Sequence, residues 1–333
     1  MPTRLYYLLE PMLPAWLASF ALLARKPHWT WRQAVGLALI LYPLIKMGFG
    51  IYYSIGALVT NPVLQPIPSA VLWRLVYEKL LLYLAVPVLG ILIFFERVPY
   101  LEAPPEVVKD GAPGMLGAAG VRAGRGLLMD AFLGCALFIP ILLAYAGAFW
   151  VAAQLSGGAG IGNERFLWQN LTPVLALLLA FVAGVTEEFL FRGLLFRHLA
   201  DRMPVWAAAL AQAVLFGFVH AGYGNWAHVV GPAIFGLAMA YVTLRMGLGA
   251  AVFLHMGINV VVFGHEVLLR DPGNPLMTSI LLAFVGANIA ALFVFRLEPL
   301  KRLWPWSPLR ARLPDEKGAP EASAPVVPGS KVL

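Results

Sequence analysis

Residues 171–199 read LTPVLALLLAFVAGVTEEFLFRGLLFRHL, an apolar run that contains one short polar segment, TEEFLFR, at residues 186–192. A run of this length can cross a hydrocarbon core of about 30 Å as a helix that rises about 1.5 Å per residue. Similar runs recur along the chain, in which 60% of the 333 residues are hydrophobic and only 12% are charged. A soluble domain carries roughly 25% charged residues. We therefore expect a polytopic membrane protein.

The apolar runs predict an all-α fold, a transmembrane helical bundle of about eight to nine spanning helices. Periodicity adds little, because a helix surrounded by lipid is apolar on every side. The first two runs are the least regular, since Glu10, Pro14 and Lys46 interrupt them. The candidate spans lie near residues 5–24, 34–58, 72–95, 127–153, 171–199, 204–221, 227–244, 248–265 and 276–296.

Three regions are expected along the chain. Residues 1–165 hold the N-terminal transmembrane helices and a hydrophilic insert at 97–125, which mixes Pro, Gly and both signs of charge. Residues 166–299 form a transmembrane core that carries the polar motifs described below. Residues 300–333 are rich in Pro, Ser and Ala with scattered charges, a composition typical of a disordered tail.

The net charge of +7 does not indicate a nucleic-acid partner, because the basic residues fall mostly between the spans. The lipid bilayer is the expected partner, and the positive-inside rule places the C-terminus in the cytoplasm. The Ala, Gly, Pro and Arg usage favours a bacterial plasma membrane. The basic set of alternating loops holds Arg25, Lys26, Arg32, Arg97, Lys109, Arg122, Arg125, Arg197, Arg202, Arg245, Lys301, Arg302, Arg310 and Arg312, and the other set holds Arg4, Arg74, Lys79, Arg165 and Arg270.

The polar segment at 186–192 puts two carboxylates and a guanidinium inside a span. Ionisable groups cost roughly 2.5–3.5 kcal/mol each on insertion, so those present usually pair or serve a function. Glu188 and Arg192 are four residues apart and share a helical face, whereas Glu187 points about 100° away. Glu188 is thus predicted to be the structural partner of Arg192, which leaves Glu187 to take a proton from water as a general base.

Two later spans carry a histidine each. The segment FGFVH ends at His220, and the segment HMGIN places His255 four residues before Asn259, on the same helical face. Counted from the nearest cytoplasmic charge, Glu187 and His255 lie about 15 Å deep and His220 about 25 Å deep, depths that allow one shared cavity. Small residues would let these helices pack closely, namely Gly184, Gly193, Gly217, Gly236, Gly247, Gly249 and Gly257.

Three functions are open at this point. An isolated Glu–Arg pair or a single membrane histidine is often structural, but two carboxylates, two histidines and an asparagine on successive spans favour a catalytic site. A transporter or channel is the first alternative, because the same residue types mark ion paths. The sequence shows neither an internal repeat nor matching broken spans in support of it. A non-catalytic membrane scaffold is the second alternative.

At these motifs the sequence resembles the CAAX protease and bacteriocin-processing family of intramembrane proteases, whose eukaryotic branch is the type II CAAX prenyl endopeptidase. The family pattern runs Glu-Glu-x-x-x-Arg, Phe-x-x-x-His and His-x-x-x-Asn, and the chain carries all three in order within about residues 170–265. The matching residues are Glu187, Glu188, Arg192, Phe216, His220, His255 and Asn259.

The resemblance implies an intramembrane endopeptidase that cleaves a membrane-anchored protein or peptide. Substrates of the CAAX, sorting-signal and bacteriocin types are processed by such proteins. It further implies that Glu187 and His220 activate a water, and that His255 and Asn259 stabilise the oxyanion of the tetrahedral intermediate. Glu188 and Arg192 would orient the site.

The resemblance leaves the metal open. Family members are often described as metalloproteases, and Glu187, His220 and His255 would supply the three protein ligands of a catalytic zinc. The local His-Glu-x-x-His arrangement of zinc peptidases is absent from the sequence. A water-activating glutamate without a cofactor is therefore the preferred interpretation, and zinc is the alternative.

Overall fold

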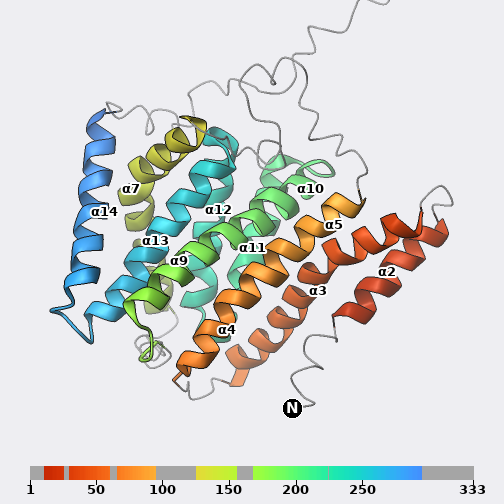
Figure 1. Cartoon of the computed structure of the whole chain (residues 1–333), viewed down its shortest axis with the longest axis horizontal. Coiled ribbons are helices and arrows are strands. Elements are labelled where there is room, and N and C mark those ends of the chain that lie inside the picture. Colours follow the sequence, from red (N-terminus) through yellow and green to blue (C-terminus); the bar gives the residue numbers. More distant parts are fainter. Residues whose placement is uncertain are drawn as a thin grey trace, which may run out of the picture.

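The computed structural model of the chain describes residues 11–25, 30–60, 66–94, 125–155, 168–223 and 225–294. Every regular element within these ranges is a helix, which confirms the predicted all-α fold (Figure 1). The tail expected at 300–333 lies outside the described residues. So does the insert expected at 97–125, apart from Arg125, which begins a helix.

The helices follow one another from one end of the described chain to the other. The N-terminal region contributes α2 (Met12–Arg25), α3 (Trp31–Thr60), α4 (Ser69–Leu80), the π-helical η1 (Leu81–Ala85), α5 (Val86–Phe94) and α7 (Arg125–Leu155). The remainder consists of α9 (Pro173–Glu188), the π-helical η3 (Phe189–Phe196), α10 (Arg197–Ala200), α11 (Val205–Val219), the 3₁₀ turn η4 (Ala221–Tyr223), α12 (Ala227–Met246), α13 (Leu248–Leu268) and α14 (Pro275–Val294).

The chain is an integral multi-pass membrane protein. By length and composition, seven helical segments in the described ranges can cross a membrane, and two shorter apolar helices, Met12–Leu22 and Pro275–Ala291, accompany them. Each predicted run corresponds to one of these nine, although residues 5–10, 95 and 295–296 lie outside the described ranges. The seven are Trp31–Gly56, Ser69–Ile93, Asp130–Leu155, Pro173–Ala200, Val205–Tyr223, Ala227–Met246 and Leu248–Leu268.

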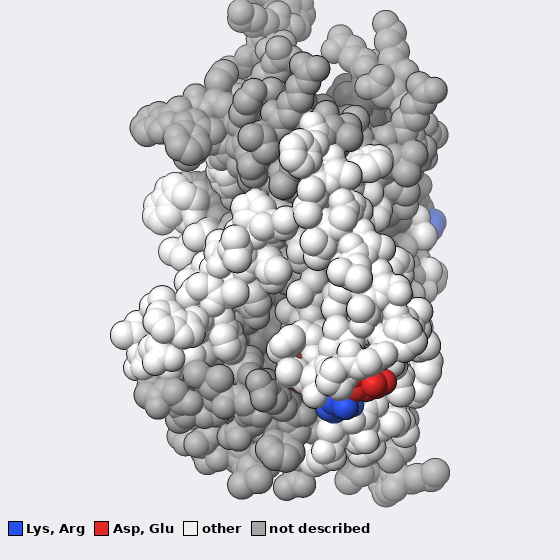
Figure 2. Space-filling view, turned by 90° about the vertical axis from the view of Figure 1, so that its left-hand side faces the viewer, with Lys and Arg blue, Asp and Glu red and all other residues white. Residues whose placement is uncertain are grey.

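The outer surface suits a lipid environment. Large apolar side chains are exposed on α14, among them Leu282, Ile289 and Phe293. Figure 2 shows this side of the molecule, where most of the described surface is uncharged and charged side chains are visible mainly near the lower end. Lipid tails can cover such a surface without loss, whereas water cannot.

The span that carries the Glu-Glu motif lies at the centre of the bundle. In the span Pro173–Ala200, 67% of the residues in an apolar stretch of 18 residues are buried, against at most 50% in the equivalent stretches of the six other spans. The helix α9 packs against α13 and α4, and α7 packs against α12 and α13 (Figure 1). The side chains of α9 are therefore shielded from lipid on most sides, which is what a polar cluster in a membrane requires.

Small residues let α9 and α13 approach closely, as predicted. A Cβ atom on Gly184 would lie 2.5 Å from Met256 Cγ and 2.8 Å from the Met256 backbone nitrogen. Further along α9–η3, Gly193 faces Leu248. The two helices therefore run antiparallel, which brings the Glu-Glu motif beside His255. Gly247, with φ of 98°, makes the tight turn from α12 into α13, a conformation that other residues rarely adopt.

Candidate active site

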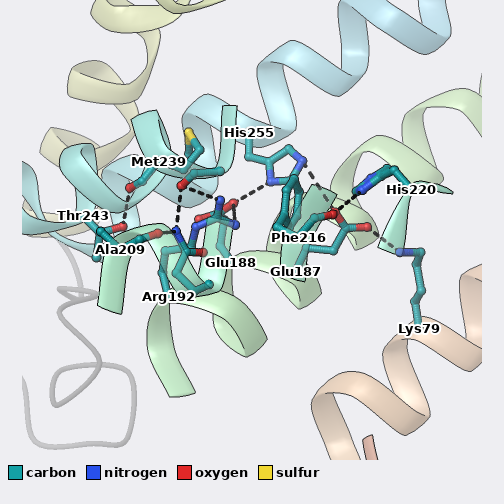
Figure 3. Close-up of polar contacts among 12 residues, drawn as sticks. Lys79, Glu187, Glu188, Arg192, Ala209, Phe216, His220, Met239, Thr243 and His255 are labelled. Carbon is teal, nitrogen blue, oxygen red and sulfur yellow. Dashed lines mark hydrogen bonds and ion pairs between the residues drawn. The ribbon is translucent and has the colours of Figure 1, made fainter. Parts of the chain in front are cut away.

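The structure brings the motif residues of three helices together (Figure 3). Glu187 and Glu188 lie at the end of α9, His220 follows the last residue of α11, and His255 lies on α13. His255 Nδ1 lies 2.7 Å from Glu188 Oε1, and His255 Nε2 lies 3.8 Å from Glu187 Oε2. One imidazole therefore bridges the two carboxylates, which the sequence motifs placed on separate helical faces.

The helical geometry changes at the carboxylates. The α-helix α9 ends at Glu188 and continues as the π-helix η3. A π-helical turn holds more residues than an α-helical turn, so it redirects the side chains on either side, and such segments are frequent at functional sites. A second π-helix, η1, begins two residues after Lys79 and contacts η3.

Glu188 and Arg192 form the predicted pair in the interior of the bundle. Arg192 Nη1 lies 2.9 Å from Glu188 Oε1, and neither side chain is exposed. Arg192 Nη2 donates to the Gly236 carbonyl at 3.1 Å, and the guanidinium carbon lies 4.6 Å from the centre of the Phe216 ring. The charge is thus neutralised by a carboxylate and supported by a carbonyl and an aromatic face, as a buried guanidinium requires.

Gln212 extends this buried network and was not predicted from the sequence. Its Nε2 donates to the carbonyls of Gly236 and Ala209, each at 3.0 Å. The Gly236 carbonyl therefore accepts from both Gln212 and Arg192. The available signal was a single amide within an otherwise apolar span, which is rare unless the group has a partner.

Glu187 has different partners from Glu188. Lys79 Nζ donates to Glu187 Oε1 at 2.5 Å, and the Glu187 side chain is 16% exposed. Lys79 and Arg74 are predicted among the loop charges, but the structure places both within α4, inside the span Ser69–Ile93. A lysine within the apolar run 72–95 was the signal that could have identified Lys79.

Phe216 explains the aromatic position of the second motif. Its carbonyl oxygen lies 2.8 Å from His220 Nδ1, so this nitrogen carries a proton and Nε2 is the acceptor of the neutral ring. The Phe216 ring lies 4.8 Å from the His220 ring and 6.0 Å from the His255 ring, between ring centres. One phenylalanine therefore positions both histidines and covers the Arg192 guanidinium.

Asn259 is the one predicted residue that the structure leaves outside these contacts. It lies on α13 one turn after His255 and is half-buried. Among the described residues, its side chain has no hydrogen-bond partner. The other five, Glu187, Glu188, Arg192, His220 and His255, are connected directly or through Phe216.

Comparison with known proteins agrees with the motifs. The model of the family described as type II CAAX prenyl endopeptidase Rce1-like matches residues 168–261. The resemblance predicted from the motifs is confirmed. The matched segment contains all seven motif residues but not Lys79. No curated protein and no solved structure matches the chain.

The zinc alternative implied by that resemblance can be tested against the donor groups. Among the described residues, no three His, Cys, Asp or Glu side chains are arranged to hold one metal ion. Glu187, which zinc would need as a ligand, has one oxygen engaged by the Lys79 ammonium. A cation at this distance competes with a metal for the same carboxylate. The described donor groups are thus not gathered around one metal position, and the mechanism is derived from the chain's own side chains.

Proposed function

We propose that the chain is an intramembrane endopeptidase that hydrolyses a peptide bond in a membrane-anchored protein or peptide. The observation that carries this proposal is the difference between the two adjacent carboxylates. Glu188 is sealed against Arg192, whereas Glu187 is partly exposed and faces His255. A reactive base needs this combination of a fixed surrounding and access for water.

Glu187 would act as the general base, assisted by His220. Glu187 Oε2 takes a proton from water, and the resulting hydroxide adds to the carbonyl carbon of the scissile bond. The tetrahedral intermediate then collapses, the carbon–nitrogen bond breaks, and the proton passes from Glu187 to the leaving amine. Figure 3 shows the His220 ring beside Glu187, where its Nε2 can accept a hydrogen bond from the same water.

His255 and Asn259 are proposed to stabilise the oxyanion. Because a carboxylate only accepts, His255 Nδ1 donates to Glu188, and this bond fixes the ring with Nε2 toward Glu187 and the water. Donation from Nε2 to the oxyanion requires the imidazolium form, in which both ring nitrogens carry a proton. Asn259 lies one turn further along α13, on the same face. Catalytic hydrogen bonds are often formed only when substrate is bound, so its amide would complete the donor pair at that stage.

The substrate class is proposed from the family resemblance. It comprises the C-terminal processing of CAAX-like proteins, sorting signals or bacteriocin-type peptides. We further propose that the protein lies in a bacterial plasma membrane with its C-terminus in the cytoplasm. Arg197, Arg202 and Arg245 flank turns at one end of the bundle, and Arg270 lies at the opposite end. Arg74 and Lys79 lie within α4, so the loops on the side with fewer basic residues hold still fewer of them than the sequence suggests.

The proposal is tested by comparing protein termini. Host cells would express the wild type, Glu187→Gln or Asp201→Asn at equal levels, and mass spectrometry would identify the termini of membrane proteins. We expect new termini with the wild type and with Asp201→Asn, an exposed turn residue, but not with Glu187→Gln. Identical termini in all three strains, with the proteins folded, would favour a transporter or a scaffold.

A further inference from the structure

Lys79 lies at the edge of the candidate active site and has no role in the mechanism above. It belongs to α4, and its contact with Glu187 joins residues that are 108 positions apart in the sequence. The Lys79 side chain is 28% exposed and that of Glu187 16%, whereas Glu188 and Arg192 are completely buried. The contact therefore lies between the sealed interior of the bundle and its surface.

The neighbouring charges leave the Lys79 ammonium to Glu187. Glu78, the residue next to Lys79, is engaged by Arg74, whose Nε lies 2.5 Å from Glu78 Oε1. Arg192 is engaged by Glu188 and the Gly236 carbonyl. Within the described part of the chain, Lys79 is the one Lys or Arg that forms an ion pair with Glu187.

Glu187 needs a cation at this place. The next residue is Glu188, and two neighbouring carboxylates in an apolar interior resist being ionised together. Arg192 forms its ion pair with Glu188. A general base must be ionised before it accepts a proton, so a separate cation has to favour the ionised form of Glu187.

The contact also orients the carboxylate. Lys79 occupies Glu187 Oε1, and Glu187 Oε2 remains on the side of His255 Nε2, 3.8 Å away. Tethered in this way, the carboxylate cannot rotate freely about its last bond. The oxygen that is left for water is thus the one that faces the two histidines (Figure 3).

We propose that Lys79 is a positioning residue of the active site, which keeps Glu187 ionised and turns Oε2 toward the catalytic water. This inference rests on the proposed function. The positions of the two π-helices support the proposal. The helix η1 begins shortly after Lys79, η3 begins directly after Glu188, and η1 and η3 contact each other. The N-terminal region thereby contributes a residue to a site whose motifs all lie after residue 168.

The experiment compares Lys79→Met, Lys79→Arg and Arg202→Met in the full-length protein, reconstituted in vesicles with a substrate that the comparison of protein termini identifies. Lys79→Met removes the charge but keeps most of the length, and we expect kcat to fall about 10- to 100-fold with KM nearly unchanged. Lys79→Arg keeps the charge and should retain most of kcat. Arg202→Met, which removes a basic residue from an exposed turn outside the site, should behave as the wild type.

Three results would overturn the proposal. Wild-type kcat in Lys79→Met would show that Glu187 works without the ammonium. A raised KM with unchanged kcat would assign Lys79 to substrate binding. An equal loss of kcat in Lys79→Met and Lys79→Arg, together with lower thermal stability of both, would reduce the contact to a structural link between α4 and α9.

Failure of the proposed function can be told apart from failure of this inference. Cleavage by a folded Glu187→Gln protein would remove Glu187 from the mechanism, and no cleavage by the wild type would reject the endopeptidase itself. A double-mutant cycle with Lys79→Met and Glu187→Gln, measured by thermal unfolding, tests the contact without any activity. We expect the two effects to be non-additive, and strict additivity would overturn the proposed role of Lys79.

Discussion

At the residue scale, the two adjacent glutamates divide two tasks between them. Glu188 is paired with Arg192 and held by His255, and Glu187 is paired with Lys79 and faces the other nitrogen of His255. Two carboxylates are thus balanced by two cations around one imidazole. Such a cluster carries little net charge, so it can lie in an apolar bundle at a lower desolvation cost than either charge alone.

This division predicts that Glu188 matters more for stability than Glu187. Glu188→Gln leaves the completely buried Arg192 without its anion, and we expect it to lower the free energy of unfolding by about 3–5 kcal/mol. Thermal and denaturant unfolding in detergent measure the loss. The control is Glu78→Gln, which breaks a partly exposed pair of the same spacing and should cost about 1 kcal/mol or less. A stable but inactive Glu188→Gln protein would reverse the assignment of the two carboxylates.

The donor groups also predict how activity responds to metal removal. Because Glu187 is engaged by Lys79 and no three suitable side chains converge among the described residues, we expect chelators to leave cleavage intact. Activity is measured before and after dialysis against a chelator, and again after zinc is added. Reversible loss that zinc restores would decide for the metalloprotease mechanism.

At the element scale, the helices followed from the length of the apolar runs, and the Glu188–Arg192 pair followed from spacing within one helix. The contact between Lys79 and Glu187 could not be predicted, because it depends on which faces of α4 and α9 meet. Helices that are apolar all round carry no periodic signal for that choice. The π-helices were also missed, since they arise from packing and not from a local sequence signal.

The closeness of α9 and α13 predicts that Gly184 is needed for the site. In Gly184→Ala, the new methyl group would meet Met256, including its backbone nitrogen at 2.8 Å, so the helices must separate. Met256 follows His255, and we expect lower activity together with a loss of about 1–3 kcal/mol in stability. Activity and thermal unfolding would be measured on the same preparation.

Gly147→Ala is the matched control for this substitution. Gly147 lies within α7, and a Cβ atom there would meet nothing within 4 Å. Alanine also favours a helix more than glycine does, so this variant should be as stable as the wild type and equally active. If Gly184→Ala behaved in the same way, the close approach of α9 and α13 would not be what positions His255.

At the scale of the whole molecule, the candidate site draws on both regions of the chain. The family match ends at residue 261 and begins at residue 168, but α4 supplies Lys79, and α7 packs against α12 and α13. The motif helices are therefore held in place by the N-terminal region. A segment reduced to residues 168–261 would expose the buried faces of α9, α12 and α13 that α4 and α7 cover.

The orientation of this bundle in the membrane predicts which turns can be reached from outside the cell. The turn after α10 is flanked by Arg197 and Arg202, and the opposite turn after α13 holds Arg270. Single cysteines would replace Asp201 or Gly273, both exposed, in a protein whose lone cysteine is removed by Cys135→Ser. By the positive-inside rule, an impermeant maleimide should label position 273 in intact cells, and position 201 only after lysis. The reverse labelling pattern would show that the bundle has the opposite orientation in the membrane, with the C-terminus outside the cell.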